Sequence, residues 1–174
     1  MKYLLIILSL ISLNFLPATA QEKLSRKERK KMEKEKLAQQ THSLVMSGKF
    51  VFNVEQVSPL RGRTLNVVTD NYTLTFNGPE AIAYLPYFGR AFSASYGSSE
   101  GGIKFNQKKQ NEKMEIDEKK DRKTISFDIN EGNEQYQCYL EIFSNGSGAL
   151  RIKPQNKDAI SYTGKIAPLP EKQK

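Results

Sequence analysis

The sequence contains very little of the chemistry that most catalytic and metal-binding sites require. Its 174 residues include one cysteine, Cys138, one histidine, His42, and no tryptophan. A single cysteine cannot form an intramolecular disulfide, so the fold must rely on packing. One histidine and one cysteine also exclude the common multi-histidine and cysteine-rich metal sites, and no Walker loop or dinucleotide-binding fingerprint is present. We therefore predict no metal site and no cofactor.

The sequence also offers no convincing set of catalytic residues. Cys138 lies far along the chain from the only histidine, and we interpret it as a buried packing residue. Glu115 and Asp117 could form a carboxylate pair of the kind that glycosidases use. However, these two residues alternate with Met114 and Ile116, which places them on the solvated face of a strand. We predict that the protein is not an enzyme and has no catalytic residues.

The N-terminus has the features of a secretory signal peptide. Lys2 provides a positive start, residues 3–16 form an apolar segment, and Ala18-Thr19-Ala20 matches a cleavage signal. Cleavage after Ala20 would leave a periplasmic or secreted protein. No cysteine lies near that point, so no lipid anchor is expected, and no later apolar run is long enough to cross a bilayer.

More than half of the net positive charge of the chain after residue 20 lies in residues 21–48, which we expect to form a charged helical arm. This segment has eight basic and four acidic residues, whereas the remainder has eighteen and fifteen. The folded part is thus only mildly basic, and we expect no nucleic-acid partner. Attraction of the arm to an anionic envelope surface remains an alternative to a simply solvated arm.

The residue pattern sets the limits of this helix. Ser25 and Glu28 have the spacing of a capping box, and Gly48 is a natural C-terminal stop. The first half has almost no apolar face, so we expect it to project into water. The second half carries an apolar stripe that should dock on the domain, formed by Leu37, Thr41, Leu44 and Val45.

From Lys49 onward the hydrophobic period changes from that of a helix to that of a strand. Nine or ten short alternating segments follow, joined mainly by tight turns such as Asp70-Asn71 and Asn145-Gly146. Tight turns and one polar face per strand predict an all-β, antiparallel meander. To avoid exposed edges it should close into an up-and-down barrel or a strongly curled sheet over residues 49–167, with one N-terminal helix. Residues 168–174 are predicted to be a disordered tail.

The stretch from Leu85 to Gly97 is neither a regular strand nor a regular helix. It combines glycines with aromatic residues and an arginine, a composition suited to a binding lip. The alternative is a crossover whose aromatic side chains close one end of the barrel. The candidate ligand-binding residues are Tyr87, Phe88, Arg90, Phe92 and Tyr96.

Several segments of the chain resemble one bacterial family. They are KFVF (49–52), YTLTF (72–76), LPYFGRAF (85–92), GGIKF (101–105) and SYTGKI (161–166). In these segments the sequence resembles the uncharacterised exported bacterial proteins grouped as domain-of-unknown-function family 4251. The resemblance covers nearly the whole chain after the arm, and its most specific part is Pro86 to Arg90. It implies an exported protein with a lipocalin-like β-barrel, and it implies no catalytic residues.

Two functions are compatible with these observations. In the first, the protein is a non-enzymatic envelope protein that binds a small apolar or amphipathic ligand, with Arg90 meeting a polar or anionic head. In the second, it is a protein–protein interaction module of the envelope that uses the aromatic lip and the basic arm.

Overall fold

The computed structural model describes residues 25–90 and 102–170, and within these ranges it contains one helix and ten strands. The helix is α2 (Arg26–Met46). Two short 3₁₀ turns, η1 (Val68–Asp70) and η2 (Glu118–Lys120), interrupt the strands. The strands are β1 (Lys49–Pro59), β2 (Leu65–Asn66), β3 (Thr73–Asn77), β4 (Glu80–Pro86), β5 (Gly102–Lys108), β6 (Gln110–Asp117), β7 (Arg122–Glu131), β8 (Glu134–Phe143), β9 (Ser147–Pro154) and β10 (Ile160–Pro168).

The chain divides into two units, residues 1–32 and residues 33–174. The described part of the first unit is the start of α2, where the predicted capping box is present. Glu28 accepts a hydrogen bond from the Ser25 amide at 2.8 Å, and the Ser25 hydroxyl accepts one from the Glu28 amide at 3.2 Å. The first of these bonds lowers the pKa of Glu28. In the part of the chain described here, α2 is too polar to qualify as a membrane-spanning helix.

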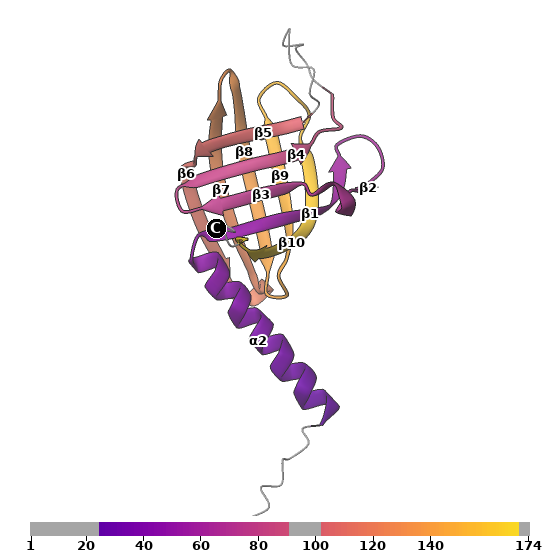
Figure 1. Ribbon diagram of the computed structural model, residues 1–174, viewed down its shortest axis with the longest axis vertical. Helices are drawn as coiled ribbons and strands as arrows, with labels where there is room; N and C mark the ends of the chain where they lie inside the picture. The colour runs from indigo at the N-terminus through magenta and orange to yellow at the C-terminus, as the bar shows by residue number, and fades with distance from the viewer. Residues whose placement is uncertain (1–24, 91–101, 171–174) are drawn as a thin grey trace, which may run out of the picture. The chain divides into compact units, whose positions relative to one another are not determined.

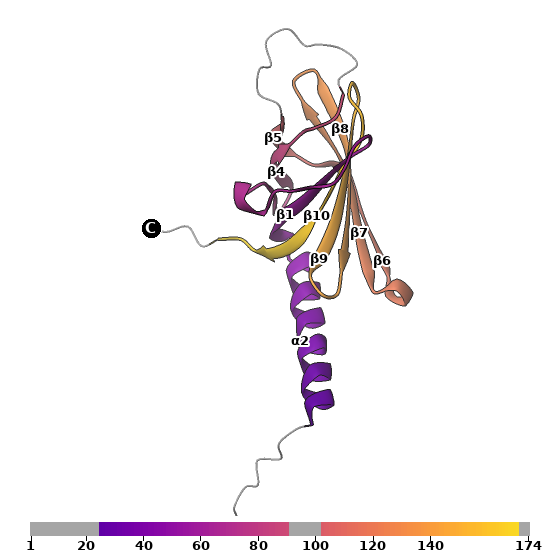
Figure 2. The ribbon, with the colours of Figure 1, turned by 90° about the vertical axis from the view of Figure 1, so that its right-hand side faces the viewer.

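The strands of the second unit form one antiparallel sheet that curls into a nearly closed barrel. The strand order is β5-β4-β3-β1-β10-β9-β8-β7-β6, with β2 paired beside β1. Figure 1 shows β1, β3, β4 and β5 crossing in front of β7, β8 and β9, and Figure 2 shows the same layers from the side. The sheet curls until β5 contacts β7. The predicted all-β fold, with a curled antiparallel sheet and one helix, is confirmed.

The seam between β1 and β10 joins the first and last strands of the domain. Nine residue pairs connect them, from Phe50 opposite Pro168 to Pro59 opposite Ile160, with an irregularity near Val54. Gly164 lies at this irregularity, where a Cβ atom would come within 1.9 Å of the Asn53 carbonyl oxygen. A glycine is therefore required at this close approach.

Strand β8 follows the alternation expected from the sequence. Tyr136, Cys138, Leu140 and Ile142 are all buried, and β8 pairs with β7 on one side and β9 on the other. The turn at Asn145-Gly146 is also as predicted, with Gly146 at a φ of 76°. Local patterning and turn chemistry are sufficient to predict this part of the fold.

One predicted hairpin is wrong. The sequence indicated that strands containing Leu65 and Tyr72–Phe76 would pair through a tight turn at Asp70-Asn71. Instead, β2 and β3 each pair with β1, and η1 fills the interval between them. Asn71 does adopt a left-handed conformation, with a φ of 52°, but it ends the 3₁₀ turn. The segment left undecided at residues 80–84 is part of strand β4.

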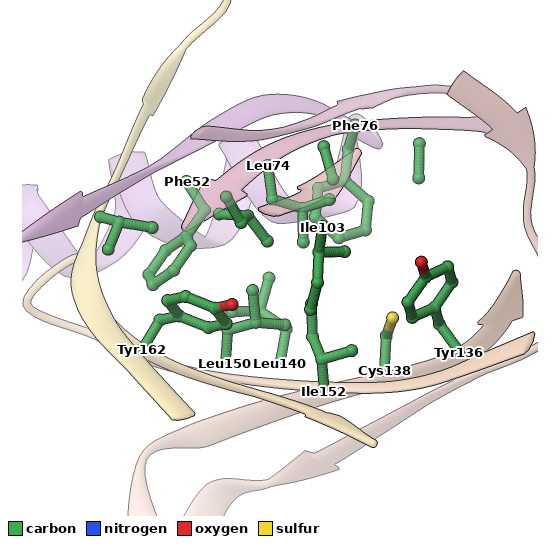
Figure 3. Packing of buried hydrophobic residues seen from close by; sticks show 14 of the residues in the cluster. Phe52, Leu74, Phe76, Ile103, Tyr136, Cys138, Leu140, Leu150, Ile152 and Tyr162 are labelled. Carbon is green, nitrogen blue, oxygen red and sulfur yellow. The ribbon is translucent and has the colours of Figure 1, made fainter. Parts of the chain in front are cut away.

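The space between the two layers is filled by large side chains. Phe50 stacks on Phe76 with ring centroids 4.5 Å apart, and Phe76 meets Phe127 edge to face at 5.5 Å. Figure 3 shows side chains of the two layers meeting, including Phe52, Leu74, Tyr136 and Ile152. These contacts give the barrel a packed core.

The second half of α2 belongs to the same unit as the sheet. Val45 is completely buried and is part of the core cluster, Thr41 is buried, and Leu44 packs against the cluster, while Leu37 is exposed. The stripe predicted for this half of the helix therefore does contact the domain, except at its first residue.

Candidate functional site

The structure describes three of the five predicted lip residues, Tyr87, Phe88 and Arg90, which follow directly after β4. Phe92 and Tyr96 lie outside the described residues. Phe88 is 48% exposed, and Arg90 is exposed as well. An exposed phenylalanine and an exposed arginine two residues apart are compatible with the predicted lip.

Tyr87, in contrast, is used to join two loops. Its hydroxyl lies 3.0 Å from the carbonyl oxygens of both Arg90 and Asp158, which share its single hydrogen, and the Asp158 amide donates to the Arg90 carbonyl at 2.9 Å. We call these three residues the loop latch. At Gly89, a Cβ atom would lie 2.3 Å from the Tyr87 hydroxyl, so the latch requires glycine there.

Charged groups surround the phenol of the latch. The Lys157 ammonium lies 5.8 Å above the centre of the Tyr87 ring and pairs with Glu134 at 3.2 Å. Burial and, to a smaller extent, the Asp158 carboxylate raise the pKa of Tyr87. The phenol therefore stays protonated and keeps its donor role at neutral pH.

A second tyrosine ties the same loops to the core. Tyr162, on β10, is completely buried, and its hydroxyl donates to the Pro86 carbonyl oxygen at 2.8 Å. Burial raises the pKa of Tyr162 and also that of Cys138, while it raises the pKa of Tyr136 to about 12. A buried thiol with a raised pKa is a poor nucleophile, which agrees with the packing role predicted for Cys138.

An open groove lies at the other end of the barrel. It has a volume of about 940 Å³ and lies between the second half of α2, the β8–β9 turn and the end of β10. We call it the helix groove. It is lined by Lys36, Leu37, Gln39, Gln40, Thr41, Ser43, Leu44, Ser47, Asn145, Gly146, Lys165, Ile166 and Pro168.

Local contacts fix the walls of the helix groove. The Ile166 amide donates to the Gly146 carbonyl at 2.9 Å, which holds β10 against the β8–β9 turn. The Asn145 side chain accepts hydrogen bonds from the amide and the hydroxyl of Ser147, at 3.0 and 2.6 Å. On the helix side, buried Val45 anchors α2 to the core.

The lining of the helix groove is amphipathic. Leu37, Leu44, Ile166 and Pro168 provide an apolar surface, and Lys36 and Lys165 provide positive charge. Lys165 also pairs with Glu55 at 3.2 Å, but the Lys165 side chain is 67% exposed and the Glu55 side chain 41%. Such surface ion pairs contribute about 1 kcal/mol or less, so Lys165 can exchange this partner for a ligand.

Sequence reasoning found only part of the helix groove. The apolar stripe of α2 was recognised as a docking face, but Lys36, Lys165 and Ile166 were not recognised as parts of one site. Nothing local in the sequence brings residues 36–47 next to residues 165–168. The pairing of β1 with β10 brings them together, because α2 leads directly into β1.

Comparison with known proteins identifies the family. A family model described as "Domain of unknown function (DUF4251)" matches residues 32–166. The chain belongs to the DUF4251 family. The resemblance inferred from the sequence is thereby confirmed, and the match spans the second half of α2 and most of the barrel. No curated protein matches the chain.

A solved structure supports the fold of this DUF4251 protein. The crystal structure of a DUF4251 family protein from Bacteroides eggerthii DSM 20697 is similar, with a TM-score of 0.59 and 20% sequence identity. The similarity covers 76% of this chain and 88% of the other. At this level of identity, the comparison shows a shared fold.

Proposed function

We propose that this protein is an exported, non-enzymatic protein of the cell envelope that binds an amphipathic ligand with a negatively charged head. The observation that carries this proposal is the helix groove, whose volume of about 940 Å³ and amphipathic lining suit such a ligand. Small-molecule sites usually measure roughly 300–1,000 Å³ and combine apolar surface with a few polar groups. The ligand class matches the one expected from the sequence, but the site differs from the aromatic lip.

The arrangement of groups in the groove supports a chain-like ligand with an anionic end. The apolar tail would cover Leu37, Leu44 and Ile166, and the head would lie between the ammonium groups of Lys36 and Lys165. The hydroxyl and amide groups of residues such as Ser43 and Gln40 would complete the coordination of the head.

The groove itself offers no acid–base pair, because its described lining residues include no carboxylate, histidine or cysteine. Export is supported by the charged start, the apolar segment and the Ala18-Thr19-Ala20 motif of the N-terminus.

A binding titration tests this function. Protein purified from the periplasm should bind the fluorescent fatty acid cis-parinaric acid, and the double variant Lys36→Glu, Lys165→Glu should bind it at least tenfold more weakly. Lys153→Glu, an exposed reversal on β9, is the matched control and should bind normally. Native mass spectrometry should also show a bound mass that disappears on denaturation. Equal binding by the double variant and the wild type would refute the groove as the site.

The protein–protein interaction role remains the second candidate, because Phe88 is 48% exposed beside Arg90. Large exposed aromatic and arginine side chains are typical interface hot spots. In this function, Phe88→Ala and Arg90→Ala would abolish capture of an envelope partner and leave cis-parinaric acid binding unchanged. Deletion of residues 21–36 would test the contribution of the basic arm in the same pull-down.

A further inference from the structure

Strand β6 is an open edge of the sheet. It pairs with β7 on one side, and among the described residues no strand pairs with its other side. Figures 1 and 2 show β6 at the margin of the β7–β9 layer. An edge strand presents unpaired backbone amide and carbonyl groups that can accept another strand.

The same strand exposes apolar side chains that its sequence pattern would place in the core. Met114 is opposite Ile125 of β7, which is 2% exposed, yet Met114 itself is 41% exposed and Ile116 is 50% exposed. The reason is the closure of the barrel: β5 contacts β7, so β6 extends beyond the covered part of the sheet.

We propose that β6 pairs antiparallel with β6 of a second copy of this chain, about a twofold axis at Met114. In this register, Lys113 of each copy lies opposite Glu115 of the other, which gives two complementary charge pairs on one face. On the other face, the two Met114 side chains meet, and Ile116 of each copy lies opposite Glu112 of the other. The Lys113–Glu115 pairs are therefore complementary, and the exposed Met114 side chain is covered by the same pairing.

The structure limits the length of β6 that is available for pairing. The β6–β7 ladder is irregular between Gln110 and Lys113, and Asn111 has a φ of 50°, so the regular strand begins after Asn111. At the other end, η2 follows Asp117. A twofold axis at Glu115 would also pair Lys113 with Asp117, but it would set the two Glu115 carboxylates directly opposite each other at the centre of the pairing, and like charges directly opposite are destabilising.

The dimer should be weak because the pairing involves only a few residues of each strand. A standard protein interface buries roughly 1,600 Å², and this one is smaller, so we expect a dissociation constant of about 10–100 µM. Sedimentation velocity of the protein produced from the full-length chain, over a concentration series spanning that range, should show a monomer converting to a dimer. A monomer at every concentration would overturn the proposal.

Charge reversal tests the register itself. Lys113→Glu and Glu115→Lys should each weaken the dimer at least tenfold. The double variant with both changes should restore it, because the charges are exchanged, and mixing the two single variants should give a heterodimer. Lys153→Glu is the control for a change of surface charge, and circular dichroism should show that every variant is folded.

Two further outcomes would overturn the proposal. If the single variants dimerise as strongly as the wild type, the contact lies elsewhere on the protein. If the double variant stays monomeric, the pairing of Lys113 with Glu115 is wrong. Binding of an extended peptide to β6 without any dimer would show that the edge serves a different partner.

Discussion

The two ends of the barrel use their polar groups in opposite ways. At the end with the loop latch, the Tyr87 and Tyr162 hydroxyls bind carbonyl oxygens of the chain itself, and Lys157 pairs with Glu134. At the end with the helix groove, lysine, serine and glutamine side chains surround an open volume of about 940 Å³. The polar groups of the latch end are thus used within the chain, whereas those of the groove end line an open volume, where we propose that the ligand binds.

The largest loss of stability is expected at the latch end from Tyr162→Ala. Removing this completely buried ring should lower the free energy of unfolding by about 4 kcal/mol, because it leaves a cavity in the core. Tyr162→Phe keeps the ring and removes only the hydrogen bond to Pro86, so its cost should be about 1 kcal/mol. Urea denaturation measures both free energies of unfolding. Similar losses for the two variants would contradict the view that the ring stabilises the fold more than its hydrogen bond does.

Alkaline pH should destabilise the fold through its buried tyrosines. Burial raises the pKa of Tyr136 to about 12, whereas the unfolded chain has a tyrosine pKa of about 10. The stabilisation is complete below pH 10 and is lost as the pH rises from 10 to 12, because the unfolded state releases its proton first. Thermal melts across this range, with phenolate absorbance, should show falling stability. Unchanged melting temperatures up to pH 12 would contradict the prediction that ionisation of the buried tyrosines destabilises the fold.

Breaking the latch alone should have a smaller effect. Tyr87→Phe removes the donor to the Arg90 and Asp158 carbonyls and should cost about 1 kcal/mol of unfolding free energy. Cis-parinaric acid binding should not change, because the latch does not line the groove. If Tyr87→Phe reduced binding as much as the groove variants do, the two ends would not be functionally separate.

The smallest effect on stability is expected at the groove. Lys165→Glu removes the surface ion pair with Glu55 and changes only an exposed residue, so the unfolding free energy should fall by no more than about 1 kcal/mol. Binding of cis-parinaric acid should nevertheless fall several-fold. Urea denaturation and the fluorescence titration, made on the same preparation, give the two values. A large stability loss with normal binding would reverse the roles assigned to the two ends.

Local patterns predicted the parts of the fold that depend on neighbours in the sequence. The alternation of β8 and the turn at Asn145-Gly146 are of this kind. The predicted pairing of β2 with β3 is wrong because both strands pair with β1 instead. The spacing of these strands in the sequence does not show that they share one partner strand.

The positions of the surface residues also depend on contacts between distant parts of the chain, which the sequence did not predict. Met114 and Ile116 alternate as core residues do, but only the closure of β5 on β7 decides that they are exposed. In the same way, Lys36 and Lys165 face one groove only because α2 leads into β1 and β1 pairs with β10. Of the predicted lip, Tyr87 has a structural role in the latch that composition alone could not reveal.

The β1–β10 seam also determines when the domain can fold. Strand β1 pairs with β10 along nine residue pairs, so the barrel lacks one of its central strand pairs until residues 160–168 are available. Contacts between distant parts of a chain make folding slow. A chain still being synthesised therefore cannot complete this barrel until its last strand emerges.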